Sequence, residues 1–171
     1  SDVSGLYNDH EYNLMIGNCC TSTAFDVESF GEAILRAENS GAVGYIGGTN
    51  STYWNEDYWW GVGAGNISEF PIYENTGLGI YDGIFHENGE EEGQWFVVND
   101  AINMAGILAV VEAGGNDAYY WEIYHNMGDP SLITSIGIPE INHVSHLPIL
   151  QIATNFFNVS AAPYPFVALS M

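Results

Sequence analysis

Residues 12–47 read YNLMIGNCCTSTAFDVESFGEAILRAENSGAVGYIG, and this stretch decides the fold class. Tyr12–Asn18 is a short, mostly apolar run that predicts a buried strand. Glu28–Ser40 places its apolar side chains on one helical face, and Ala42–Gly47 is a second apolar run. A strand, a helix and a strand within about 35 residues are typical of a βαβ unit. We therefore expect the two strands to be parallel neighbours.

The segments that follow the two predicted strands are the first candidates for a functional site. In open parallel sheets, functional residues lie just past the carboxyl ends of the strands. Cys19-Cys20 follows the first predicted strand, and Thr49–Asp57 follows the second. We expect these two segments to meet at one edge of the sheet.

The charge of the chain is unusual because basic residues are nearly absent. The 171 residues include 22 acidic residues and one basic residue, Arg36, which gives a formal net charge of −21. Such a surface repels phosphate backbones and anionic lipids, so we expect no nucleic-acid partner. No apolar run approaches the roughly 20 residues needed to cross a bilayer, so we expect no membrane insertion. With 47% hydrophobic residues, the chain can bury a substantial core.

The rest of the chain is predicted in coarser terms. Tyr58–Gln94 is irregular and suggests long loops, with short strands near Gly77–Phe85. Trp95–Ala113 is the longest helical stretch, and Asp117–Met127 predicts a second, shorter helix. Beyond Pro139, short apolar runs interrupted by prolines predict β-strands.

Metal binding has two candidates in the sequence, and neither assigns a ligand. The acidic run Glu90-Glu91-Glu92 is either a solvated loop or a cation site. The histidines have no metal-type spacing with the cysteines, so a zinc site is not expected. They are His10, His86, His125, His143 and His146.

Cys20 is the main chemical candidate. A cysteine after a buried strand is usually a small buried hydrophobic residue. Its predicted place at the carboxyl end of the strand, opposite a loop rich in aromatic and acidic residues, makes a thiolate nucleophile the alternative. Such a nucleophile needs a nearby base or cation, and none of the histidines is an obvious base. Cys19 and Cys20 are adjacent and are not expected to form a disulfide.

Several short motifs occur in a fixed order along the chain: Ile16–Cys20, Phe25-Asp26, Phe30–Glu32, Tyr45–Gly47, Tyr53–Asp57, Tyr120–Glu122 and Gly128–Ser131. Together they resemble the gingipain family of cysteine proteases, and most closely its lysine-specific branch. The resemblance runs from about Tyr12 to Pro139 and continues more weakly to the end of the chain. It implies an α/β, caspase-like fold with a mainly parallel sheet flanked by helices in residues 1–138. Residues 139–171 would then hold the first strands of an immunoglobulin-like domain.

The resemblance assigns the nucleophile and shows what is missing. The nucleophile of the family falls on Cys20, and Cys19 would be a structural neighbour. The base of the family is a histidine followed by glycine, upstream of the nucleophile, and no His-Gly pair occurs in this sequence. We therefore expect an N-terminal companion chain of the same precursor to supply the histidine and an oxyanion glycine. Only the backbone N–H of Cys20 remains as an oxyanion donor here.

The resemblance also places part of a substrate pocket on the second segment. Trp54 would cover the aliphatic stem of a lysine side chain, Tyr53 would border it, and Asp57 would meet its ammonium group. The alternative is that Tyr53 and Trp54 only pack and that Asp57 is solvated.

The predicted function is therefore that of a secreted or cell-surface cysteine endopeptidase that cleaves proteins and peptides after lysine. The resemblance further implies proteolytic processing, a role in virulence, no catalytic cofactor, and calcium as a structural ion with unassigned ligands. The rival prediction is a non-catalytic relative that serves as a binding or structural module. A His-Gly pair in the segment preceding Ser1 would favour the enzyme.

Overall fold

The structure is a computed structural model that describes residues 2–77, 79–85, 98–133, 143–149 and 156–162 of the chain. It divides into two compact units, Ser1–Ile136 and Gly137–Met171. Each unit is described by itself. The assignment of residues 1–138 to a peptidase domain and of residues 139–171 to an immunoglobulin-like domain stays a prediction.

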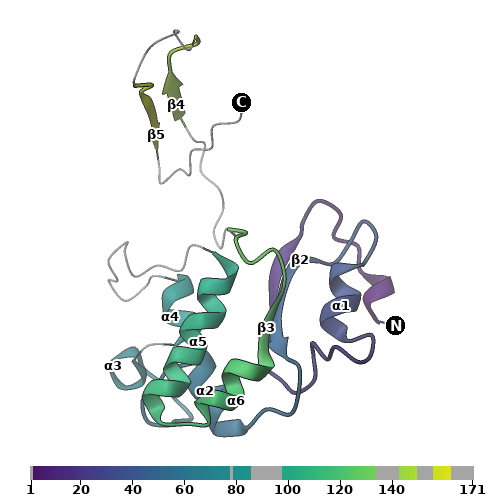
Figure 1. Cartoon of the computed structure of the whole chain (residues 1–171), viewed down its shortest axis with the longest axis vertical. Coiled ribbons are helices and arrows are strands. Elements are labelled where there is room, and N and C mark those ends of the chain that lie inside the picture. The colour runs from purple at the N-terminus through teal and green to yellow at the C-terminus, as the bar shows by residue number, and fades with distance from the viewer. Residues whose placement is uncertain (1, 78, 86–97, 134–142, 150–155, 163–171) are drawn as a thin grey trace. The chain divides into compact units, whose positions relative to one another are not determined.

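A three-stranded sheet forms the centre of the first unit (Figure 1). Strands β1 (Asn13–Gly17) and β2 (Ala42–Gly48) are parallel neighbours, which confirms the predicted βαβ unit. Strand β3 (Tyr124–Gly128) pairs antiparallel with β2, so β2 lies in the middle. The carboxyl ends of β1 and β2 therefore lie at the same edge of the sheet.

The crossover helix α1 (Phe30–Leu35) is shorter than the predicted span of Glu28–Ser40. The Ser29 side chain caps its start by accepting the N–H of Glu32 at 3.3 Å. After the helix, the chain turns into β2 through Gly41, whose φ of 94° is one that glycine adopts without steric cost.

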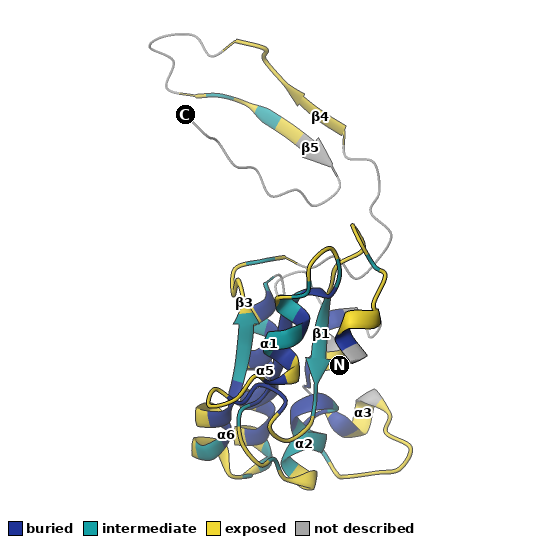
Figure 2. Cartoon of the chain, turned by 90° about the vertical axis from the view of Figure 1, so that its right-hand side faces the viewer, coloured by how far each residue is buried: buried dark blue, intermediate teal, exposed yellow. Residues whose placement is uncertain are grey.

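Two hydrophobic clusters cover the two faces of the sheet. The smaller cluster lies under α1 and includes Ile34 and Tyr45. The larger cluster lies on the opposite face and includes Ile46 and Trp60. The helices on that side are α2 (Trp54–Gly61), α4 (Ile80–Phe85), α5 (Asn99–Ala113) and α6 (Asp117–Ile123). The face of α5 that meets the sheet is buried (Figure 2). The short elements η1 (Asp2–Gly5) and α3 (Tyr73–Thr76) complete the unit.

The predicted strands near Gly77–Phe85 are wrong, because Ile80–Phe85 forms helix α4. Ile80 and Ile84 are one helical turn apart, and both are buried in the larger cluster. Their four-residue spacing was the signal for a helix.

The predicted helix over Asp117–Met127 is only half right, because α6 ends at Ile123 and β3 begins at Tyr124. Tyr120, Ile123 and Tyr124 follow a helical spacing, which favours continuing the helix. Pairing with β2, more than seventy residues earlier in the chain, makes Tyr124–Gly128 a strand instead. The spacing of apolar residues within this segment carries no information about its long-range pairing with β2.

The predicted long helix is confirmed where the structure describes it. Helix α5 begins at Asn99, and the first predicted residues, 95–97, lie outside the described residues. Gly114 ends the helix in the left-handed conformation, with φ of 72°.

The second unit contains one described pair of strands. Strands β4 (His143–His146) and β5 (Val159–Ala162) are antiparallel, which agrees with the predicted β-structure beyond Pro139. Two strands do not establish an immunoglobulin-like sandwich. The acidic run at residues 90–92 and the C-terminal residues 163–171 lie outside the described residues.

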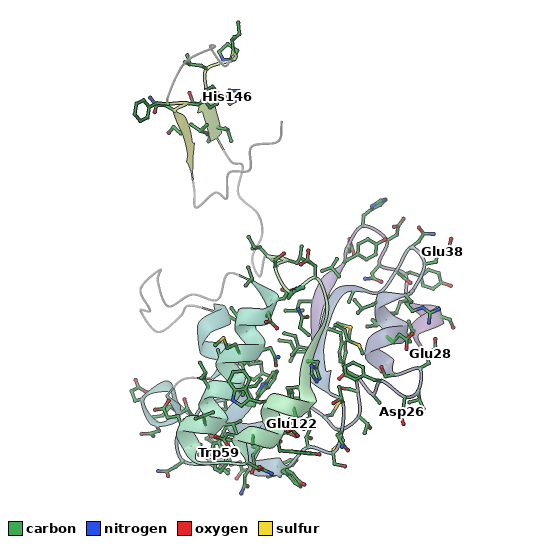
Figure 3. The ribbon with its side chains drawn as sticks, viewed as in Figure 1. Asp26, Glu28, Glu38, Trp59, Glu122 and His146 are labelled. Atoms are coloured by element: carbon green, nitrogen blue, oxygen red, sulfur yellow. The ribbon has the colours of Figure 1, made fainter. Side chains whose placement is uncertain are left out.

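The surface around α1 illustrates the acidic character of the chain. Asp26, Glu28 and Glu38 are exposed there (Figure 3). The only arginine, Arg36, forms an ion pair with Glu32 at 2.8 Å. Within the described residues, no helix is long and apolar enough to span a membrane.

Candidate functional site

Cys20 lies in an exposed turn directly after β1. Both Cys19 and Cys20 are free and exposed, as expected for adjacent cysteines. The next residue, Thr21, has φ of 52°, a left-handed conformation that costs a β-branched residue about 1–3 kcal/mol. The N–H of Thr21 donates to the Asn50 carbonyl at 3.0 Å. This bond fastens the strained turn to the segment after β2.

The sulfur of Cys20 is held by Thr52, so the two predicted segments do meet. The N–H of Thr52 donates to Cys20 Sγ at 3.2 Å, and Thr52 Oγ1 lies 3.4 Å from the same sulfur. Hydrogen bonding with the Thr52 side chain, followed by that with its N–H, lowers the pKa of Cys20, while burial and the nearby Asp57 charge oppose this. Cys20 is therefore an exposed thiol whose pKa is lowered by its contacts with Thr52.

Asp57 lies in the first turn of α2, and its half-buried carboxylate accepts hydrogen bonds from three hydroxyl groups. Thr52 Oγ1 donates to Oδ2 at 2.6 Å. The Tyr120 hydroxyl shares its proton between Asp57 Oδ1 at 2.9 Å and the Tyr53 carbonyl at 3.1 Å. The Tyr124 hydroxyl shares its proton between Asp57 Oδ1 at 2.8 Å and Asn18 Oδ1 at 2.6 Å. A carboxylate has about four lone-pair positions, so one position on Oδ2 remains for a further donor. An ammonium group is the kind of donor that suits it.

Two tyrosine hydroxyls fasten the Asp57 region of α2 to α6 and β3. Tyr120 accepts the N–H of Tyr53 at 2.9 Å, and the Tyr124 hydroxyl lies 2.6 Å from Asn18 Oδ1. Asn18 Nδ2 in turn donates to the Asp57 carbonyl at 2.8 Å. Burial, followed by smaller contributions that include Asp57, raises the pKa of both tyrosines far above the usual range, so both stay protonated donors.

Tyr53 and Trp54 form an exposed aromatic surface at the start of α2. The Trp54 side chain is 86% exposed and that of Tyr53 is 48% exposed, so Trp54 is not a core residue. The Tyr53 ring lies 5.6 Å from the Tyr119 ring. Tyr119 also donates its hydroxyl to the Ser51 carbonyl at 2.9 Å. The roles of Tyr53 and Trp54 in a substrate pocket stay a prediction.

No described histidine contacts Cys20. His125 lies on β3 opposite Gly47, its ring is 5.2 Å from that of Phe25, and its Nε2 is 2.9 Å from the Glu122 carbonyl oxygen. His86 lies outside the described residues. In the part of the chain that the structure describes, no group of three His, Cys, Asp or Glu side chains could hold a metal ion.

The sequence did not predict Thr52, Asn18 or Tyr124 as site residues, and it gave Tyr120 no role. Thr52 lies inside the predicted second segment, but a threonine next to a thiol has no sequence signature. Tyr120 and Tyr124 are four residues apart, so both hydroxyls could be expected on one side of the chain. Their target could not be predicted, because it depends on how α2 packs against β3.

Comparisons with known proteins decide the family. The model of peptidase family C25 matches residues 1–134. The chain belongs to this family, which consists of cysteine peptidases of the gingipain type. It is 37% identical to Lys-gingipain W83 and 36% identical to Lys-gingipain HG66, both from Porphyromonas gingivalis. Each alignment of 180 residues covers 99% of this chain and 10% of the relative. The chain thus spans about one tenth of the length of these curated relatives.

Two solved structures resemble the chain. One, titled "Structure of Protease", has 37% sequence identity and a TM-score of 0.75, and covers 87% of this chain and 34% of its own. The other is gingipain R, an Arg-specific cysteine proteinase, with 18% identity and a TM-score of 0.74. That alignment covers 94% of this chain and 34% of the proteinase. At this low identity, the second likeness supports the fold alone.

Proposed function

We propose that this chain carries the nucleophile and the lysine-binding residues of a cysteine endopeptidase. One observation supports it most: Cys20 Sγ and the Asp57 carboxylate both contact the single residue Thr52. A reactive sulfur and a carboxylate with a remaining acceptor position therefore lie on either side of one residue. The Cys20 thiolate attacks the carbonyl carbon of the peptide, the amine leaves with a proton from the base, and water releases the acyl group.

In this proposal, the lysine side chain lies across the exposed Trp54 indole, with Tyr53 at its border and Asp57 at its ammonium group. Lysine is thinner than the planar guanidinium of arginine, which gives a narrow pocket a means to discriminate. The named relatives at 36–37% identity are Lys-gingipains. No lysine occurs among the 171 residues, although lysine is common in ordinary proteins. A peptidase that cleaves after lysine gains from this absence.

The remaining machinery belongs to a proposed companion chain of the same precursor. It would supply the catalytic histidine and an oxyanion glycine beside the N–H of Cys20. The proposal includes proteolytic processing, export to the cell surface or the medium, a role in virulence and a structural calcium ion. It also includes an immunoglobulin-like domain that begins at residue 139.

The test uses the complete protein and a peptide with lysine before the scissile bond. Cys20→Ala is expected to abolish hydrolysis, whereas the matched control Cys19→Ala is expected to keep most of it. Retained hydrolysis in Cys20→Ala would refute the assigned nucleophile. If the complete protein with Cys20 intact hydrolysed no lysine peptide, the rival function as a non-catalytic binding module would be favoured.

A further inference from the structure

Thr52 contacts both functional side chains but has only one hydroxyl proton. Its Oγ1 lies 2.6 Å from Asp57 Oδ2 and 3.4 Å from Cys20 Sγ. We propose that Thr52 is a positioning residue that couples Asp57 to Cys20, because its hydroxyl can donate to the carboxylate or to the sulfur, but not to both. The inference rests on the proposed function of these two residues.

With the carboxylate free of substrate, the hydroxyl of Thr52 donates to Asp57. The 2.6 Å contact is short, and an ionised carboxylate is a strong acceptor. Thr52 Oγ1 then offers only a lone pair to the sulfur, which suits the S–H of a neutral thiol. A thiolate in this arrangement keeps one donor from Thr52, the N–H at 3.2 Å.

An ammonium group on Asp57 changes this balance. The ammonium donates to the remaining position on Oδ2 and neutralises the carboxylate, which weakens its hold on the Thr52 proton. The hydroxyl then turns to Cys20 Sγ, and the thiolate gains a second donor. The proton stays on the Thr52 oxygen throughout, and only the hydrogen bond changes partner. Binding of a cationic side chain thus favours the ionised form of Cys20. A cationic substrate is therefore expected to raise the rate of the chemical step as well as to bind more tightly.

Other groups act on Cys20 directly and must be separated from this effect. Asp57 faces it from α2 through its charge, and Tyr119 faces it from α6. Cys19 precedes it in the same turn. Burial, followed by the nearby Tyr53, raises the pKa of Tyr119, which therefore stays neutral where thiols ionise. The direct Coulomb effect of Asp57 is the one that a test must subtract.

A double-mutant cycle separates the two effects. All variants are made in the complete protein with Cys19→Ala, so that alkylation at this turn reports on Cys20 alone. The rate of Cys20 alkylation by iodoacetamide is measured against pH for this parent, Asp57→Asn, Thr52→Val and the double variant. Asp57→Asn is expected to lower the midpoint of the alkylation rate against pH by about one pH unit. The variant removes the negative charge near Cys20 and frees the Thr52 hydroxyl to donate to the sulfur. Thr52→Val alone is expected to move the midpoint of the pH–rate curve little, because in this parent the Thr52 hydroxyl donates to Asp57 and the N–H that donates to the sulfur is kept.

The coupling is the difference between two shifts of the alkylation midpoint: the shift that Asp57→Asn causes with Thr52 present, and the shift that it causes in Thr52→Val. In Thr52→Val, the shift caused by Asp57→Asn is expected to fall to less than half, because only the direct charge effect remains. The control Thr52→Ser keeps the hydroxyl and is expected to keep the full shift. Equal shifts in both backgrounds, or no shift at all, would overturn the coupling. Failure of the proposed function would give a different result, namely lysine-peptide hydrolysis that persists in Cys20→Ala.

Discussion

Cys20 and Asp57 lie on either side of Thr52, yet the chain holds them very differently. The thiol half of the site, Cys19–Thr21, is an exposed turn with a strained residue. In the carboxylate half, residues 53–57 are fastened by Tyr120 and Tyr124, both buried in the larger cluster.

The difference shows which part of the proposed chemistry this chain completes by itself. The carboxylate half has its hydroxyl donors in place, so under the proposed function it is preorganised before any substrate arrives. The thiol half has the hydrogen bond from the Thr52 N–H to Cys20 Sγ, but no described histidine contacts the sulfur. Under the proposed function, recognition therefore lies in this chain, while the proposed companion chain supplies the group for proton transfer.

The largest expected effect comes from removing that outside group. Residues 1–171 expressed alone are expected to hydrolyse no lysine peptide, since general acid–base catalysis contributes about 10²–10⁴-fold. The complete protein is the positive control, and its Cys20→Ala variant sets the zero. A soluble, active preparation of residues 1–171 alone would show that the thiol half is complete after all.

The next effect comes from the carboxylate half. Asp57→Asn is expected to lower kcat/KM for lysine peptides roughly a hundredfold, because truncating one partner of a buried charge pair costs about 2–5 kcal/mol. The matched control is Glu56→Gln, in the same helical turn, whose Oε1 only accepts the N–H of Asn116 at 3.3 Å. Similar losses in both variants would mean that overall negative charge, rather than Asp57, attracts the substrate.

A smaller effect tests how firmly the carboxylate half is fastened. Tyr124→Phe removes the hydroxyl shared by Asp57 and Asn18, and is expected to lower the free energy of unfolding by about 1–2 kcal/mol. Tyr58→Phe is the control, because its hydroxyl makes only exposed bonds to Asn66 and Ser68, and its expected cost is within about 0.5 kcal/mol. Chemical denaturation of the complete protein measures both. Equal costs would remove the distinction between the two halves.

The same contrast explains which features could be predicted from sequence. The strands of the βαβ unit follow from local apolar runs and their connection, and this rule also brings Cys20 near the second segment. Helix α4 was missed although Ile80 and Ile84 carried a helical spacing. Strand β3 could not be found from Tyr124–Gly128 itself, because its pairing partner lies far away in the sequence.

The candidate site divides in the same way. Cys20, Tyr53, Trp54 and Asp57 were named from motifs, and the structure brings all four to one edge of the sheet. The hydroxyl groups that bind Asp57 were not predicted, because donors gather on a carboxylate only after α2 and β3 pack together. Thr52 shows this most clearly, since its role depends on two distances and on no pattern.

The central claim is that the carboxylate half selects lysine for the thiol half to attack. Its most direct test is the rate at which the complete protein hydrolyses two peptides that differ only in lysine or arginine before the scissile bond. We predict a kcat/KM for the lysine peptide well above that for the arginine peptide. Equal rates, or a preference for arginine, would contradict the assignment of Tyr53, Trp54 and Asp57 to a lysine pocket.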